Sequence, residues 1–161
     1  MIFLGVAKSY NEETREKMFS HFPPPPTHVP EKDMINSKYL TLRDAISDLG
    51  EPYENYPIPN HICNKHKVKI TGYIGNRKLD WDKPSPTIVG RGGGTGGPVI
   101  AVHPNLKRRF SVRESARLQT FPDDFVFKGP ISSQFRQIGN AVAVGFAEHL
   151  GHMLKKIEKH I

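Results

Sequence analysis

Hydrophobic and polar residues follow a helical period in the stretch from Thr41 to Leu49. Apolar side chains recur there every three or four positions, as in a helix that buries one face and exposes the other. Thr41 suits the N-cap, because its hydroxyl can accept from a free backbone N–H, and Gly50 suits the C-terminal stop. The pattern predicts a helix whose buried face consists of Leu42, Ala45, Ile46 and Leu49.

A second helix is predicted over residues 111–119. It opens on the S-x-x-E pattern of a capping box, formed by Ser111 and Glu114, and Pro122 closes it off. A third, short helix begins near Ser132 or Ser133.

The last predicted helix covers residues 141–159. One of its faces is polar, and the opposite face carries apolar residues at helical spacing, namely Val142, Phe146, Leu150, Met153, Leu154 and Ile157. Left without a partner, this apolar face predicts poor solubility or self-association.

The remaining apolar runs are short and favour strands. Residues 2–7 form a continuous apolar run, typical of a strand buried on both faces that needs a sheet to join. The four prolines 23–26 impose an extended spacer, which indicates a boundary between two packing units. Residues 51–104 are rich in Pro, Gly and Asn and predict short strands on long loops, with β-branched runs at Val68–Thr71, Thr87–Val89 and Val99–Val102.

Composition narrows the class of protein. At 161 residues and 37% hydrophobic content the chain can bury one modest core. The net charge of +7 favours a polyanionic partner, because clustered cations neutralise phosphates and release counterions. Many basic proteins bind no nucleic acid, so charge alone leaves this partner open.

Cysteine content and hydropathy point to a soluble cytoplasmic protein. Cys63 is the single cysteine, so no internal disulfide can form, and a reducing compartment is the simplest interpretation. The apolar residues 1–7 are too few for a secretory signal, and no stretch approaches a membrane span.

Two short motifs are weak candidates for chemistry. Residues 92–97 fit G-x-G-x-x-G, but Pro98 follows where a phosphate-binding helix should open, which favours a hairpin loop that lets backbone approach DNA. His61, Cys63 and His66 lie close together, but no second ligand pair follows, so a surface loop is favoured over zinc. Nothing supplies a base for Cys63 as a nucleophile.

Three arginines form a regular series along the second predicted helix. Arg109, Arg113 and Arg117 are spaced four residues apart and predict one positive stripe. The stripe is explained either as a solvated face or as a set of groups that contact phosphates or brace loops. The sequence leaves these alternatives open.

Two segments carry a family resemblance. Residues 108–125, R-R-F-S-V-R-E-S-A-R-L-Q-T-F-P-D-D-F, and residues 137–142, Q-I-G-N-A-V, resemble the ninth and tenth motifs of cytosine-C5 DNA methyltransferases in wording, order and separation. Residues 2–6 resemble the strand that ends the eighth motif, although the Gln-x-Arg-x-Arg before it is absent. The passages that resemble parts of the target-recognition domain or its approach are Pro26–His28, Thr41–Leu49 and Trp81–Thr87.

The resemblance implies methyl transfer from S-adenosyl-L-methionine to C5 of a cytosine flipped out of double-stranded DNA. Family members use a cysteine in a Pro-Cys context and a glutamate in a Glu-Asn-Val context; neither context occurs in this sequence, so no catalytic residue is assigned. The tenth-motif residues, expected at the N-terminus of the last helix, would enclose the methionine part of the cofactor: Gly139, Asn140, Ala141 and Val142. Without the resemblance, Gly139 and Asn140 indicate only a turn and cap.

For DNA, the resemblance assigns the ninth-motif helix mainly to organising the recognition domain. Arg109, Arg113 and Arg117 are therefore expected to brace loops or contact phosphates. Base reading is expected from the loops of residues 60–97, in which Arg77, Lys78 and Arg91 can present donors to guanine or phosphate.

The predicted architecture is mixed α and β. Residues 1–22 are expected to be a strand and linker of an incomplete Rossmann-like catalytic domain, residues 23–128 a small, mostly β, loop-rich recognition domain, and residues 129–161 a helical return to the catalytic domain. The preferred hypothesis is the small subunit of a two-chain methyltransferase, favoured by Met1 just before the eighth-motif strand. A non-catalytic DNA-binding module or remnant, and a piece cut from a longer enzyme, are the alternatives.

Overall fold

A computed structural model describes residues 39–63, 79–90, 102–105 and 108–158. Several sequence-based predictions lie outside these residues, so they stay predictions. They comprise the strand at 2–7, the proline spacer at 23–26, the run at 68–71, most of the run at 99–102 and the glycine-rich loop at 92–97.

The first described helix, α2 (Leu42–Ile46), confirms the helix predicted from Thr41. Thr41 is the N-cap, and its hydroxyl accepts from the backbone N–H of Asp44 while the Asp44 carboxylate accepts from the Thr41 N–H. The helix is shorter than predicted because Ser47 already forms the C-cap. Leu42 and Ile46 are fully buried, as the periodicity indicates.

The second helix, α3 (Val112–Leu118), opens on the predicted capping box of Ser111 and Glu114. Its end differs from the prediction. Thr120 takes a φ of 59°, in the left-handed region, and turns the chain two residues before Pro122 is reached. The helix therefore ends through a backbone reversal rather than through the proline.

The last two helices meet at a different place than predicted. Helix α4 (Ile131–Asn140) begins after Pro130, close to the predicted start, and extends to Asn140. Helix α5 begins only at Val144 and ends at Glu158. Gly139 and Asn140 therefore close α4 instead of opening the last helix, since the α4 backbone continues without interruption through both residues.

The mostly β recognition domain is not found in the part of the chain that the structure describes. Those residues contain four helices and no named strand, and their one strand-like pairing is the isolated bridge of Val102 with Arg109. The β-branched run Thr87–Val89 forms an irregular segment. Ile88 packs on the core beside α4, so its hydrophobic character reflects burial by a helix rather than strand pairing.

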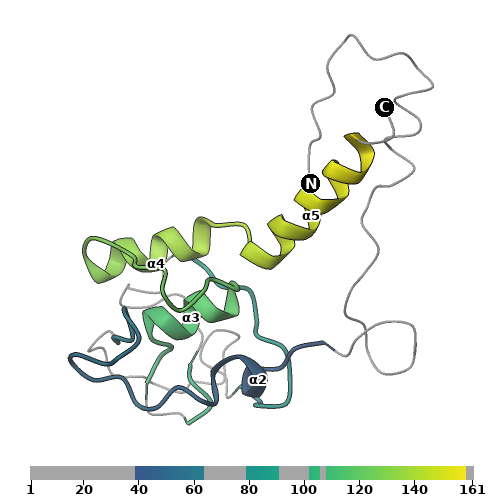
Figure 1. Ribbon diagram of the computed structural model, residues 1–161. Helices are drawn as coiled ribbons and strands as arrows, with labels where there is room; N and C mark the ends of the chain where they lie inside the picture. Colours follow the sequence, from purple (N-terminus) through teal and green to yellow (C-terminus); the bar gives the residue numbers. More distant parts are fainter. Residues whose placement is uncertain (1–38, 64–78, 91–101, 106–107, 159–161) are drawn as a thin grey trace.

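Two hydrophobic clusters lie around α3, which sits between α2 and α4 while α5 leads away from them (Figure 1). The first cluster joins α2 to neighbouring loops through Leu42, Ile46, Leu49, Leu79 and Phe110. The second joins α3 to α4 through Val112, Ala116, Phe127, Phe135 and Ile138. None of the helices described is long and apolar enough to cross a membrane.

Candidate functional site

The arginines of the ninth-motif segment, residues 108–125, hold loops from inside the fold. Arg113 has no exposed surface, and its guanidinium donates to three backbone carbonyls. The acceptors are the oxygens of Pro59 at 2.8 Å, Pro122 at 2.8 Å and Phe125 at 2.6 Å. Burial lowers the pKa of Arg113, and the three carbonyls satisfy the fork of donors that desolvation would otherwise leave unpaired.

Arg117 connects two segments that are distant in sequence. It forms a two-point contact with Asp123, with Nε to Oδ1 at 2.8 Å and Nη2 to Oδ2 at 2.6 Å. The same guanidinium donates to the Asp48 carboxylate and to the Ala45 carbonyl, which lie at the end of α2. The hydrogen bond and charge of Asp123 raise the pKa of Arg117, and Arg117 in turn lowers the pKa of Asp123.

The predicted positive stripe does not form, and burial of Arg109 and Arg113 excludes the solvated face, one of its two explanations. Arg109 is only 9% exposed, and burial lowers its pKa. Arg113 is fully buried, and only Arg117 retains partial exposure. Arg109 lies before the helix, whose N-cap is Ser111, and pairs with Val102 in an isolated bridge, so the helical series of three arginines was wrong for Arg109. Arg113 and Arg117 are four residues apart on α3, but Arg113 is buried, so the three cations do not share one solvent-exposed face.

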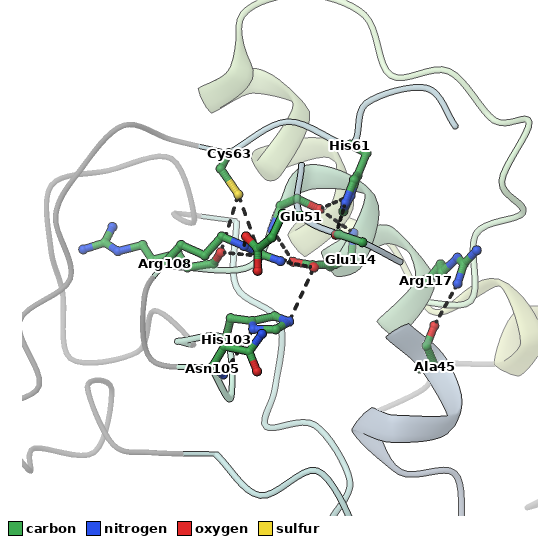
Figure 2. Close-up of polar contacts among 12 residues, drawn as sticks. Ala45, Glu51, His61, Cys63, His103, Asn105, Arg108, Glu114 and Arg117 are labelled. Atoms are coloured by element: carbon green, nitrogen blue, oxygen red, sulfur yellow. Dashed lines mark hydrogen bonds and ion pairs between the residues drawn. The ribbon is translucent and has the colours of Figure 1, made fainter. Parts of the chain in front are cut away.

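Glu114 is the centre of a buried polar network beneath these loops (Figure 2). Its carboxylate is fully buried and accepts two hydrogen bonds from Arg108, at 2.7 and 2.8 Å, and one from the Ser111 backbone at 2.7 Å. Arg108 also donates to Glu51 at 2.8 Å. Burial opposes the charge of Arg108, but the two carboxylates outweigh burial and raise its pKa.

His103 lies against the same carboxylate. Its Nε2 is 3.6 Å from Glu114 Oε1, and its ring stacks edge-on between Trp81 and Phe110. The backbone N–H of Asn105 donates to Nδ1 at 3.2 Å, which requires that nitrogen to be unprotonated. Burial lowers the pKa of His103, so the neutral ring is the form that fits this site.

Neither His61 nor Cys63 is arranged for chemistry. The Nε2 of His61 donates to the Gly50 carbonyl, and its Nδ1 accepts from the Ser111 hydroxyl, both at 2.9 Å. Burial raises the pKa of the Cys63 thiol to about 11, which disfavours the thiolate. Among the described residues no group of three potential metal ligands occurs, and His66 lies outside them.

Asn60 is a structural residue that the sequence interpretation missed. Its side chain donates to the Phe127 carbonyl and to Gln134, each at 3.0 Å, and accepts from the Phe127 N–H at 2.8 Å. Its own carbonyl accepts from the backbone N–H of Arg113. Asn60 has a φ of 62°, and asparagine is one of the few residues that tolerate this region, so its identity was the available signal.

The tenth-motif residues lie at a close contact between α4 and the segment before Arg91. A Cβ added to Gly139 would overlap the backbone of Val89 and Gly90. A Cβ added to Gly90 would in turn lie 3.0 Å from Asn140 Oδ1 and 3.5 Å from the Arg136 Cα. Two glycines thus allow two backbones to touch, which is the role the structure assigns to Gly139.

Beyond Asn140 the chain turns into a short junction, residues 141–143, that connects α4 to α5. Ala141 is extended, with a ψ of 147°. Val142 is 61% exposed and Phe146, in the first turn of α5, is 46% exposed. The four predicted cofactor residues, 139–142, therefore run from the last turn of α4 into the junction, and the last of them, Val142, faces solvent.

The three basic residues predicted to read DNA cannot be placed in this site. Arg77, Lys78 and Arg91 all lie outside the described residues.

The sequence profile of the C-5 cytosine-specific DNA methylase family matches residues 1–156. The chain belongs to this family.

Individual relatives agree with this assignment. The chain is 34% identical to the type II methyltransferase M.Eco47II of Escherichia coli, over 76% of this chain and 37% of that protein. It is 36% identical to the type II methyltransferase M.MthTI of Methanothermobacter thermautotrophicus, over 74% of this chain and 44% of that protein. A shorter match, 46% identical over 48% of this chain, is to the DNA (cytosine-5)-methyltransferase CMT3 of Arabidopsis thaliana. The chain thus spans about two fifths of the length of the first two relatives.

Proposed function

We propose that this chain is the DNA-recognising part of a DNA (cytosine-5-)-methyltransferase that uses S-adenosyl-L-methionine. The observation that carries the proposal is the family match over residues 1–156. The names of two relatives, both type II methyltransferases, support a place in a restriction-modification system. The chain would act on double-stranded DNA in the cytoplasm.

In this proposal the catalytic cysteine comes from outside the chain. Cys63 is not in a Pro-Cys context, and its thiol pKa of about 11 leaves little thiolate at neutral pH. A second polypeptide carrying the earlier motifs would supply the nucleophile, the glutamate and most of the cofactor site. The Rossmann-like sheet to which residues 1–22 and 129–161 would return belongs to that partner.

The site residues divide into three roles. The tenth-motif residues 139–142 would contribute the last part of the cofactor site, with the exposed side of the junction towards S-adenosyl-L-methionine. Arg113 and Arg117 would brace the recognition domain, residues 23–128, because their donors already hold carbonyls and carboxylates. Phosphate and base contacts would fall to Arg77, Lys78 and Arg91, with Arg109 closer to bracing because it is buried.

The test is transfer of a radiolabelled methyl group to mixed-sequence duplex DNA. We expect no transfer by this chain alone and transfer by the chain mixed with a polypeptide that carries the Pro-Cys and glycine-rich motifs. DNA binding is measured in parallel by a method that does not need turnover. A stable complex that binds DNA but never methylates it would refute the proposal and favour a non-catalytic recognition module.

A further inference from the structure

We infer that Gln119 and Thr120 are positioning residues for the cofactor junction, residues 141–143, and that they connect it to the recognition domain. The inference rests on the proposed function, because it assumes that the tenth-motif segment contacts S-adenosyl-L-methionine. Both residues follow α3 directly, and neither was singled out by the sequence motifs as a site residue.

The side chain of Gln119 hydrogen-bonds to the C-terminal end of α4. Its side-chain nitrogen donates to the Ile138 carbonyl at 3.1 Å and to the Ala141 carbonyl at 3.3 Å. In a continuing helix the Ile138 carbonyl would accept from the N–H of Val142, but Ala141 is extended and breaks that ladder. The Ile138 carbonyl accepts from the Ala141 N–H at 3.2 Å instead, and the Gln119 amide is its second donor. The same amide donates to the Ala141 carbonyl, so Gln119 contacts both sides of the turn.

The same two residues also hold the start of α5. The Gln119 carbonyl accepts from the Val144 N–H at 3.1 Å, and Thr120 Oγ1 accepts from the Gly145 N–H at 2.7 Å. These are N–H groups of the first turn, which have no partner within their own helix. Gln119 thus contacts the chain on both sides of the junction, and Thr120 contacts the first turn of α5 just after it.

The backbone of Thr120 carries a conformational cost at this position. Its φ of 59° is unfavourable for a β-branched residue. A Cβ on Gly145 would lie 3.4 Å from Thr120 Oγ1, so the first turn of α5 comes close to the hydroxyl. The hydrogen bond from the Gly145 N–H to the Thr120 hydroxyl is one contact that holds this backbone conformation in place.

The other end of this connection is the recognition domain. Helix α3 is held by Arg113 to the carbonyls of Pro59 and Phe125, and by Arg117 to the end of α2. Hydrogen bonds from α3 and from the two residues after it therefore join those loops to the junction.

The experiment uses the complete enzyme, this chain with the polypeptide that supplies the earlier motifs. Gln119→Leu removes both donated bonds, and Thr120→Val removes the hydroxyl while keeping the branched shape. We expect each to raise KM for S-adenosyl-L-methionine about fivefold or more, the ratio that loss of one hydrogen bond produces. Affinity for duplex DNA in the absence of cofactor should change by less than about twofold.

Two matched variants complete the design. Thr120→Ser keeps the oxygen and should restore KM to within about twofold of the unaltered enzyme. Tyr56→Phe removes a comparable side-chain bond to backbone, from the Gly50 N–H, in the other hydrophobic cluster and should leave KM unchanged. Thr120 is exposed, so we expect Thr120→Val and Thr120→Ser to fold. This pair of variants tests the inference even if Gln119→Leu fails to fold.

The outcomes separate this inference from the function on which it rests. An unaltered enzyme that does not bind S-adenosyl-L-methionine would overturn both. An unaltered enzyme that binds it, together with variants that lose thermal stability or active fraction at an unchanged KM, would reduce Gln119 and Thr120 to structural residues and overturn the inference alone.

Discussion

At the scale of single residues, Gly139 leaves the least room for a side chain among the glycines in the described part of the chain. A Cβ there would overlap the backbone of Val89 and Gly90, and backbone cannot move aside as a flexible side chain can. We expect Gly139→Ala to lower the free energy of unfolding by about 2 kcal/mol, the cost of overpacking a close contact, despite the better helix propensity of alanine. Urea denaturation at neutral pH measures the change.

Gly151→Ala is the matched control. Gly151 is also helical, in α5, and a Cβ there would meet nothing within 4 Å. This substitution should stabilise the protein by about 0.5–1 kcal/mol, because alanine loses less backbone entropy. Similar effects of the two substitutions would contradict the close contact at Gly139.

His103 makes stability depend on pH at the same scale. Burial lowers its pKa below the ordinary 6.5, so below about pH 6.5 the unfolded chain takes up a proton that the folded protein does not. Stability from this group is therefore present above that pH and falls as the pH decreases. We expect His103→Gln to reduce the loss of stability between about pH 7.5 and 5.5, measured by urea midpoints.

His152→Gln controls for the loss of an imidazole. The His152 side chain is 70% exposed on α5, so the variant should keep the pH slope of the unaltered protein. A His103→Gln protein whose slope equals that of His152→Gln would show that burial of His103 does not govern the pH dependence.

At the scale of elements, the two capping boxes look alike but differ in what surrounds them. The Thr41 hydroxyl caps α2 and, among the described residues, bonds only within its own capping box, to Asp44. The Ser111 hydroxyl caps α3 and also satisfies Nδ1 of the buried His61. We expect Thr41→Ala to cost about 1 kcal/mol and Ser111→Ala about 2–3 kcal/mol, because the latter leaves a buried acceptor without a partner.

Thermal or urea unfolding of both variants measures this difference. Ser132→Ala, in the first turn of α4, is the control, because that helix has no side-chain cap and Ser132 is exposed. It should change stability by less than about 0.5 kcal/mol. Equal losses for Thr41→Ala and Ser111→Ala would mean that His61 does not depend on the hydroxyl.

At the scale of the whole molecule, α5 and the junction before it expose apolar side chains to solvent. Val142, Phe146 and Leu154 are 61%, 46% and 40% exposed. In the chain without a partner polypeptide we expect self-association that grows with concentration, because exposed apolar patches of this kind associate. Sedimentation velocity measures it, and Phe146→Ser should shift the distribution towards monomer. A compact monomer at every concentration would contradict the prediction.

Local signals were sufficient for the starts of α2 and α3, whereas α5 begins only at Val144 and not at the predicted residue 141. The capping residues Thr41, Ser111 and Glu114 act through atoms within three positions in sequence, so their hydrogen bonds follow from the chain itself. The two family motifs could likewise be recognised from the sequence, because each is one continuous segment, residues 108–125 and residues 137–142. The run Thr87–Val89 was misread as a strand because β-branched residues suit any half-buried surface, including one against a helix.

What the sequence by itself determined is therefore the starts of α2 and α3, the apolar face of α2 and the family. Tertiary structure alone decided that Arg113 is buried among three carbonyls, that α4 continues through Gly139, and that Gln119 reaches the junction from the end of α3. The reason is physical. Hydrogen bonds and burial between residues far apart in sequence depend on which segments pack together, and helical spacing carries no information about what covers a face.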